Sequence, residues 1–143
     1  MPELKVNGSV PVSLEDAWAA VTDLGRYDDW LVLHDGWRSE LPADLQEGQR
    51  IESVIKARGI RNRIAWTIED LRPPRHVSLA GDGVGGAKVT MTFDLAGDDR
   101  ATTVAMVVDF RHPMLKGPMG GLAARTIRGD LETSMKRLVE ITR

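Results

Sequence analysis

The stretch from Met119 to Thr142, which reads MGGLAARTIRGDLETSMKRLVEIT, decides the fold. Apolar or small side chains recur in it at a spacing of three and four residues, which places them along one side of a helix. These side chains are Met119, Leu122, Ala123, Thr126, Ile127, Leu131, Met135, Leu138 and Ile141. At 1.5 Å per residue the helix is roughly 36 Å long. It needs a broad apolar surface to lie on, which the rest of the chain can supply only as a sheet.

Two polar residues, Asp130 and Ser134, also project into the apolar side of this helix, one turn apart. In one interpretation Asp130 lies at the edge of the apolar side and meets water or an arginine, which the rarity of buried carboxylates favours. In the other interpretation the helix faces a cavity, and the two residues are its polar contacts.

The length and the amino-acid composition are those of an ordinary globular protein. The chain has 143 residues, 42% hydrophobic and 28% charged, and we expect a single domain over 1–143. The net charge of −2 gives no reason to expect nucleic acid as a partner. The absence of cysteine excludes disulfides and thiol chemistry. Because no apolar run approaches the length of a membrane span and no signal region follows Met1, we expect a cytoplasmic protein.

The rest of the chain predicts two short helices and seven strands. Ser13 is a suitable N-cap for a helix that ends near Asp23, and a second short helix is expected over 26–33. Alternation of apolar and polar residues predicts strands over 4–10, 37–41, 50–58, 61–71, 75–80, 88–95 and 101–111. Strands joined by short turns form an antiparallel meander with one apolar face. The sequence therefore predicts an α+β fold, in which a curved sheet of about seven strands holds the helices on its concave face.

Three motifs near the start of the chain resemble the opening signature of a known superfamily. They are Pro11-x-Ser13-x-Glu15-x-Ala17-Trp18, Val21-Thr22-Asp23 and Arg26-Tyr27-x-x-Trp30. They are similar to the polyketide cyclase/dehydrase-like branch of the START and Bet v 1-like (SRPBCC) superfamily, and the expected element order extends the resemblance over the whole chain. The resemblance implies a helix-grip fold. It also implies a deep, mostly apolar cavity between sheet and closing helix, which holds lipids, sterols, polyketides or other hydrophobic molecules.

Further motifs resemble a mycobacterial member of this superfamily described as the toxin of a type II toxin–antitoxin pair. They are Trp30-Leu31-x-x-His34, Trp37-Arg38-Ser39, Asn62-Arg63-Ile64-x-Trp66-Thr67-Ile68 and Gly81-Asp82-Gly83-Val84-Gly85-Gly86. This resemblance implies a protein partner.

A basic cluster on the outer face is the candidate surface for such a partner. It comprises Lys56, Arg58, Arg61 and Arg63 around one hairpin. The alternative, which the nearly neutral total charge favours, is a solvated face balanced by Glu52 and Glu69.

No motif in the sequence indicates a bound cofactor or metal ion. Gly81-x-Gly83-x-x-Gly86 matches the dinucleotide pattern, but an alternating strand follows it where a helix is required, so we expect a tight turn. The three histidines lack metal-ligand spacing, and no serine, histidine and acid cluster announces a nucleophilic triad. We expect no metal and no cofactor.

The leading hypothesis is a binding protein for a hydrophobic small molecule, since tryptophans and methionines on the inner face suit an adaptable pocket. Plain core packing is the alternative for each such residue. A cyclase or aromatase-type enzyme is the second hypothesis, with Asp130 and His34 as its only candidate bases, and no catalytic residue is assigned. The predicted ligand-binding residues are Trp30, His34, Trp37, Ser53, Ile55, Trp66, Met91, Phe93, Met106, Val108, Phe110, Met119, Ile127, Asp130 and Ser134.

Overall fold

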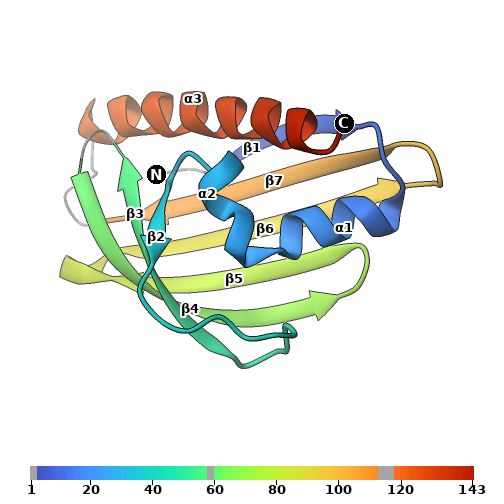
Figure 1. Ribbon diagram of the computed structural model, residues 1–143. Helices are drawn as coiled ribbons and strands as arrows, with labels where there is room; N and C mark the ends of the chain where they lie inside the picture. Colours follow the sequence, from blue (N-terminus) through green and yellow to red (C-terminus); the bar gives the residue numbers. More distant parts are fainter. Residues whose placement is uncertain (1–2, 58–59, 113–117) are drawn as a thin grey trace.

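A single curved sheet forms the frame of the molecule (Figure 1). The computed structural model describes residues 3–57, 60–112 and 118–143, with residues 118–120 described by their backbone alone. Seven antiparallel strands follow one another in the order β1-β7-β6-β5-β4-β3-β2, so only β1 leaves the chain order to pair with β7. The strands are β1 (Leu4–Val10), β2 (His34–Trp37), β3 (Arg50–Ala57), β4 (Ile60–Arg72), β5 (His76–Gly83), β6 (Lys88–Gly97) and β7 (Thr102–Arg111).

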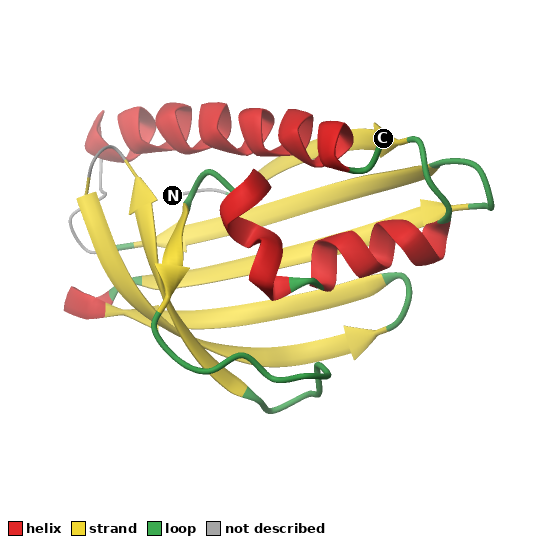
Figure 2. Ribbon diagram, in the orientation of Figure 1, coloured by secondary structure: helices red, strands yellow, loops and turns green. Residues whose placement is uncertain are grey.

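All the longer helices lie on the concave face of the sheet (Figure 2). Helix α1 (Leu14–Thr22) begins as predicted, with the Ser13 hydroxyl accepting a hydrogen bond from the Asp16 backbone N–H at 3.2 Å. A 3₁₀ turn η1 (Leu24–Arg26) leads into the single-turn helix α2 (Tyr27–Trp30). Helix α3 (Pro118–Ile141) closes the concave face. This arrangement confirms the predicted α+β helix-grip fold.

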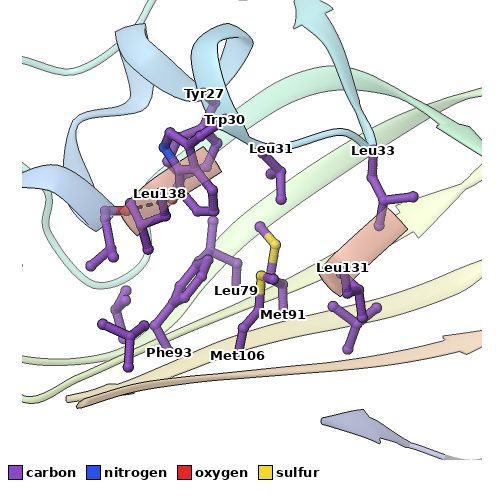
Figure 3. Close-up of a cluster of buried hydrophobic side chains, with 14 of the residues drawn as sticks. Tyr27, Trp30, Leu31, Leu33, Leu79, Met91, Phe93, Met106, Leu131 and Leu138 are labelled. Atoms are coloured by element: carbon purple, nitrogen blue, oxygen red, sulfur yellow. Dashed lines mark hydrogen bonds between the residues drawn. The ribbon is translucent and has the colours of Figure 1, made fainter. Parts of the chain in front are cut away.

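The core fills the space between the sheet and the helices (Figure 3). Alternate residues of each long strand point inward, as the period of two predicts. Strand β6 shows the pattern, with Val89, Met91, Phe93 and Leu95 all buried. From the helix side, Ile127, Leu131, Met135 and Leu138 of α3 are buried against them.

Helix α3 packs along the edge strand β1 at a close approach. A Cβ atom added to Gly8 would lie 2.4 Å from Cγ of Met135, which is much closer than real carbon atoms come. Glycine at this position therefore lets the helix lie close to the sheet.

The second predicted helix is shorter than expected, and the strand predicted over 37–41 begins earlier. The Leu31 backbone N–H closes the one turn of α2 on the Tyr27 carbonyl at 2.9 Å. A turn over Val32 and Leu33 follows, in which the His34 backbone N–H donates to the Leu31 carbonyl at 3.0 Å. Strand β2 occupies His34–Trp37, with His34 opposite Ile55 and Trp37 opposite Ser53. The prediction was wrong here because an apolar run as short as 31–33 does not by itself specify a helix.

Two smaller expectations were also wrong. The turn expected over 81–86 starts later, because β5 continues to Gly83 before the 3₁₀ turn η2 (Val84–Gly86). Gly85 and Gly86 do adopt positive φ angles of 74° and 83°, as a tight turn requires. Leu122, placed by its spacing on the apolar side of α3, is 46% exposed. Around the helix axis, its side chain points in a direction well away from that of Ile127, so it does not reach the sheet.

Candidate ligand cavity

An apolar cavity lies between the concave face of the sheet, the α2–β2 segment and α3. Its lining comprises Tyr27, Leu31, Leu33, His34, Trp37, Ser53, Ile55, Ala57, Trp66, Leu79, Val89, Met91, Val108, Phe110 and Ile127. The open volume inside the cavity is only about 20 Å³. That is roughly the room one water molecule needs. Any larger ligand therefore requires the lining side chains to move apart.

An aromatic group forms one wall of the cavity. The ring centroid of Tyr27 lies 5.8 Å from that of Trp37 and 6.0 Å from that of His34. Two hydrogen bonds to backbone carbonyls fix this wall, since the Tyr27 hydroxyl donates to Val21 and the Trp37 indole N–H donates to Leu24, both at 2.7 Å. Burial raises the pKa of the Tyr27 hydroxyl, and the Asp23 carboxylate adds to this effect. Tyr27 therefore remains protonated and serves as a fixed hydrogen-bond donor.

His34 is the polar side chain most deeply set in this wall. Its side chain is 2% exposed, its ring lies 4.7 Å from that of Trp37, and neither ring nitrogen makes a hydrogen bond within the described part of the chain. The Asp28 carboxylate lies 3.4 Å from Nε2, without the alignment of a hydrogen bond. Burial lowers the pKa of His34, and the nearby Asp28 and Asp35 only partly oppose this shift. The imidazole is therefore neutral at pH 7 and has unused hydrogen-bonding capacity.

Ser53 is the second polar residue of the lining. Its Oγ accepts a hydrogen bond of 2.8 Å from the Trp66 indole N–H, and both groups are buried. No acceptor for the Ser53 hydroxyl hydrogen occurs among the hydrogen bonds of the described residues. Ser53 lies on β3, directly beside β2, so it shares this wall with His34.

The two polar residues of α3 lie outside the lining. The Ser134 hydroxyl accepts from the Val32 backbone N–H at 2.9 Å and donates to the Asp130 carbonyl at 2.7 Å, so it is a buried link between α3 and the α2–β2 segment. Asp130 is partly buried, and burial raises the pKa of its carboxyl group. None of the ion pairs among the described residues includes Asp130, which lies at the edge of the apolar side.

The structure brings many of the predicted ligand-binding residues together around the cavity. Those in the lining are His34, Trp37, Ser53, Ile55, Trp66, Met91, Val108, Phe110 and Ile127. Trp30, Phe93 and Met106 lie in the fully buried core, where Trp30 contacts Phe93 edge to face at 5.9 Å. The side chain of Met119 is outside the described residues.

Six lining residues were not predicted, namely Tyr27, Leu31, Leu33, Ala57, Leu79 and Val89. Four of them follow from signals in the sequence, because Ala57 and Val89 lie on the inner positions of their strands, Leu79 shares the alternation of β5, and Tyr27 lies within a quoted motif. Leu31 and Leu33 were missed because a helix was expected over 26–33. Their spacing in such a helix does not place both side chains toward the cavity.

Two residues of the basic cluster on the outer face have acidic partners, while Lys56 takes part in none of the ion pairs among the described residues. Arg61 lies 3.0 Å from Asp35 and Arg63 lies 2.8 Å from Glu52, in ion pairs between exposed or half-exposed side chains. Arg58 is outside the described residues. This pairing agrees with a solvated face, although Asp35 rather than Glu69 is the second acidic partner.

The described residues offer no other chemical centre at the cavity. Within them no three His, Asp or Glu side chains gather in a way that could hold a metal ion. Where the dinucleotide pattern ends, strand β6 follows at Lys88, so this part of the chain provides no helix N-terminus for a pyrophosphate. Across the described ranges no helix has both the length and the apolar character of a membrane span.

Comparison with solved structures supports the fold. A protein from Thermus thermophilus, TTHA0849, matches with a TM-score of 0.78 at 19% identity, over 97% of this chain and 95% of that one. The Zhui aromatase/cyclase from Streptomyces sp. R1128 matches with a TM-score of 0.75 at 13% identity, over 99% and 93% of the two chains.

Two sequence relatives come from Mycobacterium tuberculosis strain H37Rv. Toxin Rv0910 is 40% identical over 139 residues, which cover 96% of each chain. The protein named uncharacterized protein Rv1546 is 37% identical over 141 residues, which cover 99% of each chain. Residues 1–141 match the family described as polyketide cyclase/dehydrase and lipid transport. The chain, with its curved sheet closed by α3 over an apolar cavity, belongs to this family.

Proposed function

We propose that this protein binds a hydrophobic small molecule in the cavity between the sheet and α3. The observation that carries the proposal is the lining, in which apolar and aromatic side chains from the sheet and the helical segments surround one space. Binding sites for small molecules typically combine such a lining with a few polar groups. Membership of a family that includes lipid-transport proteins supports the same conclusion.

The ligand enters by displacing side chains, because the open volume is that of about one water molecule. Met91 suits this role, since an unbranched thioether changes rotamer at low cost. Burying about 400 Å² of apolar ligand surface contributes about 10 kcal/mol at roughly 25 cal/mol per Å². The costs of association and of moving the lining reduce this to an affinity near the micromolar range.

A cyclase reaction is a narrower version of this proposal. The fold shared with the Zhui aromatase/cyclase is compatible with it, and such a reaction needs a base inside the cavity. His34 lines the cavity, whereas Asp130 does not, so His34 is the residue on which a cyclase activity depends. Turnover of a poly-ketone substrate that is lost in His34→Phe, while binding remains, supports an enzyme. Normal turnover in that variant excludes His34 as the base.

Native mass spectrometry of the freshly purified protein, with extraction of any bound molecule, tests the binding function. We expect a reproducible added mass in the wild type and its loss in Met91→Trp, because the larger side chain fills the ligand's space. The matched control is Met91→Leu, which keeps the volume and retains the ligand. If no mass is found and fatty acids, sterols and aromatic polyketides all fail to bind, the proposal is wrong.

A toxin-like action through a protein partner is the second candidate, and the 40% identity to Toxin Rv0910 favours it. Two surfaces compete for such a partner. One is the basic cluster, in which Arg61 and Arg63 are already paired with acids. The other comprises exposed Ile60, Val84 and Leu122, which belong to β4, η2 and the start of α3 at one end of the molecule (Figure 1).

Growth arrest on expression of the protein shows which of the two surfaces binds the partner. Arrest that is lost in an Arg61→Ala and Arg63→Ala double variant indicates the basic cluster. Arrest that is lost only when Ile60 and Val84 are changed to serine indicates the apolar end. If expression causes no arrest, the toxin-like candidate is excluded.

A further inference from the structure

Some polar atoms of the cavity wall already have a hydrogen-bond partner within the protein, and others do not. Of the lining side chains, five carry a nitrogen or an oxygen atom: Tyr27, His34, Trp37, Ser53 and Trp66. The hydroxyl of Tyr27 and the indole N–H groups of both tryptophans donate to partners within the protein. What remains is the His34 imidazole and the hydroxyl hydrogen of Ser53.

Leaving these groups without a partner is unfavourable. A buried polar group without a hydrogen bond loses its interactions with water and gains nothing in return. The His34 side chain is 2% exposed and Ser53 is 1% exposed, so bulk water has little access to either of them. A ligand that satisfies both groups therefore gains specificity as well as affinity.

The chemistry of the two groups defines the matching ligand. The Ser53 oxygen already accepts from Trp66, so its hydroxyl has a hydrogen to donate. A neutral imidazole has one N–H that donates and one nitrogen that accepts. The Asp28 carboxylate, 3.4 Å from Nε2, favours the hydrogen on Nε2, which leaves Nδ1 to accept. A ligand hydroxyl accepts from Ser53 and donates to His34, whereas a carbonyl only accepts. A carboxylate adds a buried negative charge next to Asp28 and Asp35, whose charges already act on His34.

We infer that the cavity selects an apolar molecule that carries one neutral hydroxyl group, held between the His34 imidazole and the Ser53 hydroxyl on the β2–β3 wall. This inference rests on the proposed binding function. It identifies the ligand class as apolar alcohols or phenols, in preference to hydrocarbons and carboxylic acids of the same shape. His34 acts as a specificity-determining residue and not as part of the apolar packing.

The test uses three probes of one shape, namely naphthalene, 2-naphthol and 2-naphthoate, at pH 8. Their dissociation constants are measured on the wild type, on His34→Phe, which keeps a ring without nitrogens, and on His34→Gln, which keeps a hydrogen-bonding group. The ratio of the naphthol and naphthalene constants within one protein removes any change of cavity size that affects both probes equally. Comparing this ratio between proteins then removes the differences in size and solubility between the two probes.

We expect the preference for 2-naphthol over naphthalene to fall about tenfold in His34→Phe, which corresponds to one hydrogen bond, and to be largely retained in His34→Gln. In the wild type, 2-naphthoate binds more weakly than 2-naphthol. The ring nitrogens of His34 shift in NMR spectra when 2-naphthol binds and do not shift with naphthalene, which a purely structural role does not produce.

The outcomes separate the inference from the proposed function. If naphthalene and 2-naphthol both bind and their ratio is the same in His34→Phe, the cavity function stands and the inference is wrong. Tighter binding of 2-naphthoate than of 2-naphthol also overturns the inference. If none of the probes binds the wild type, the proposed function fails and the inference fails with it.

Discussion

Ser134 links α3 to the segment that carries the aromatic wall of the cavity. Its hydroxyl accepts from the Val32 backbone N–H across 102 positions of sequence, and Ser134 itself is fully buried. In Ser134→Ala this N–H loses its partner, so we expect the free energy of unfolding to fall by about 1–3 kcal/mol. Urea denaturation measures the change.

Thr133→Ala is the matched control, because Thr133 is the exposed neighbour whose hydroxyl bonds only to the Gly129 carbonyl of its own helix. Its substitution changes stability by less than about 0.5 kcal/mol. Equal effects of the two substitutions contradict the role given to Ser134.

His34 makes the stability of the protein depend on pH. Burial lowers its pKa below the ordinary value of about 6.5. Asp28 and Asp35 face it with negative charge and Arg38 with positive charge. As the pH falls below about 6.5, the unfolded chain takes up the proton before the folded protein does, so stability decreases. Below the lowered pKa both states are protonated and the decrease ends.

We expect the wild type to lose stability relative to His34→Phe as the pH falls from about 7 to about 5, because the variant has no imidazole to protonate at this position. Urea denaturation at a series of pH values measures the difference between the two proteins. The subtraction removes the contributions of all the groups that both proteins share. A difference that is independent of pH contradicts the lowered pKa.

At the scale of elements, the contact between β1 and α3 determines how closely the helix covers the sheet. An added methyl group at Gly8 meets the Cγ and sulfur atoms of Met135 at 2.4 and 2.5 Å. We expect Gly8→Ala to destabilise the protein by about 1–3 kcal/mol, as overpacking does. Thermal unfolding measures the change.

Gly129→Ala is the opposite case on α3, because nothing lies within 4 Å of an added Cβ atom there. We expect it to stabilise the helix by about 0.5–1 kcal/mol, since glycine is a poor residue inside a helix. If both substitutions stabilise, α3 is not packed closely against β1.

The extent to which the sequence predicts this molecule also differs between elements. Long elements with a clear period, such as β6 and α3, were predicted to within about two residues, because many side chains report on the same face. The segment 31–41 was not, since the pairing of His34 with Ile55 and of Trp37 with Ser53 depends on a strand far along the chain. For the same reason Leu31 and Leu33 escaped the list of cavity residues. Whether Trp30 packs in the core or lines the cavity also depends on three-dimensional packing that no local pattern contains.

At the scale of the whole molecule, the cavity is a place where the core is incompletely packed between two layers. A sheet that curves around one long helix leaves its centre to be filled by side chains from both layers, and here the lining nearly fills it. A fold of this kind binds a ligand at the expense of its own packing, so the volume of the lining side chains sets the balance between stability and affinity.

Leu79→Ala tests this balance, because Leu79 lines the cavity and is 2% exposed. We expect the free protein to lose about 2–5 kcal/mol, as large-to-small core substitutions do. The enlarged cavity then accepts an apolar probe such as 2-naphthol without displacing side chains, so the probe binds the variant more tightly than the wild type. At a probe concentration about 100 times the dissociation constant, binding restores about 2.7 kcal/mol.

Thermal unfolding with and without the probe measures both effects. Val77→Ala is the matched control, because Val77 is equally buried on β5 but lies outside the lining. It is destabilised, and the probe stabilises it no more than it stabilises the wild type. If the probe stabilises Val77→Ala as much as Leu79→Ala, the two positions open one continuous space and the cavity extends further along β5 than its lining indicates.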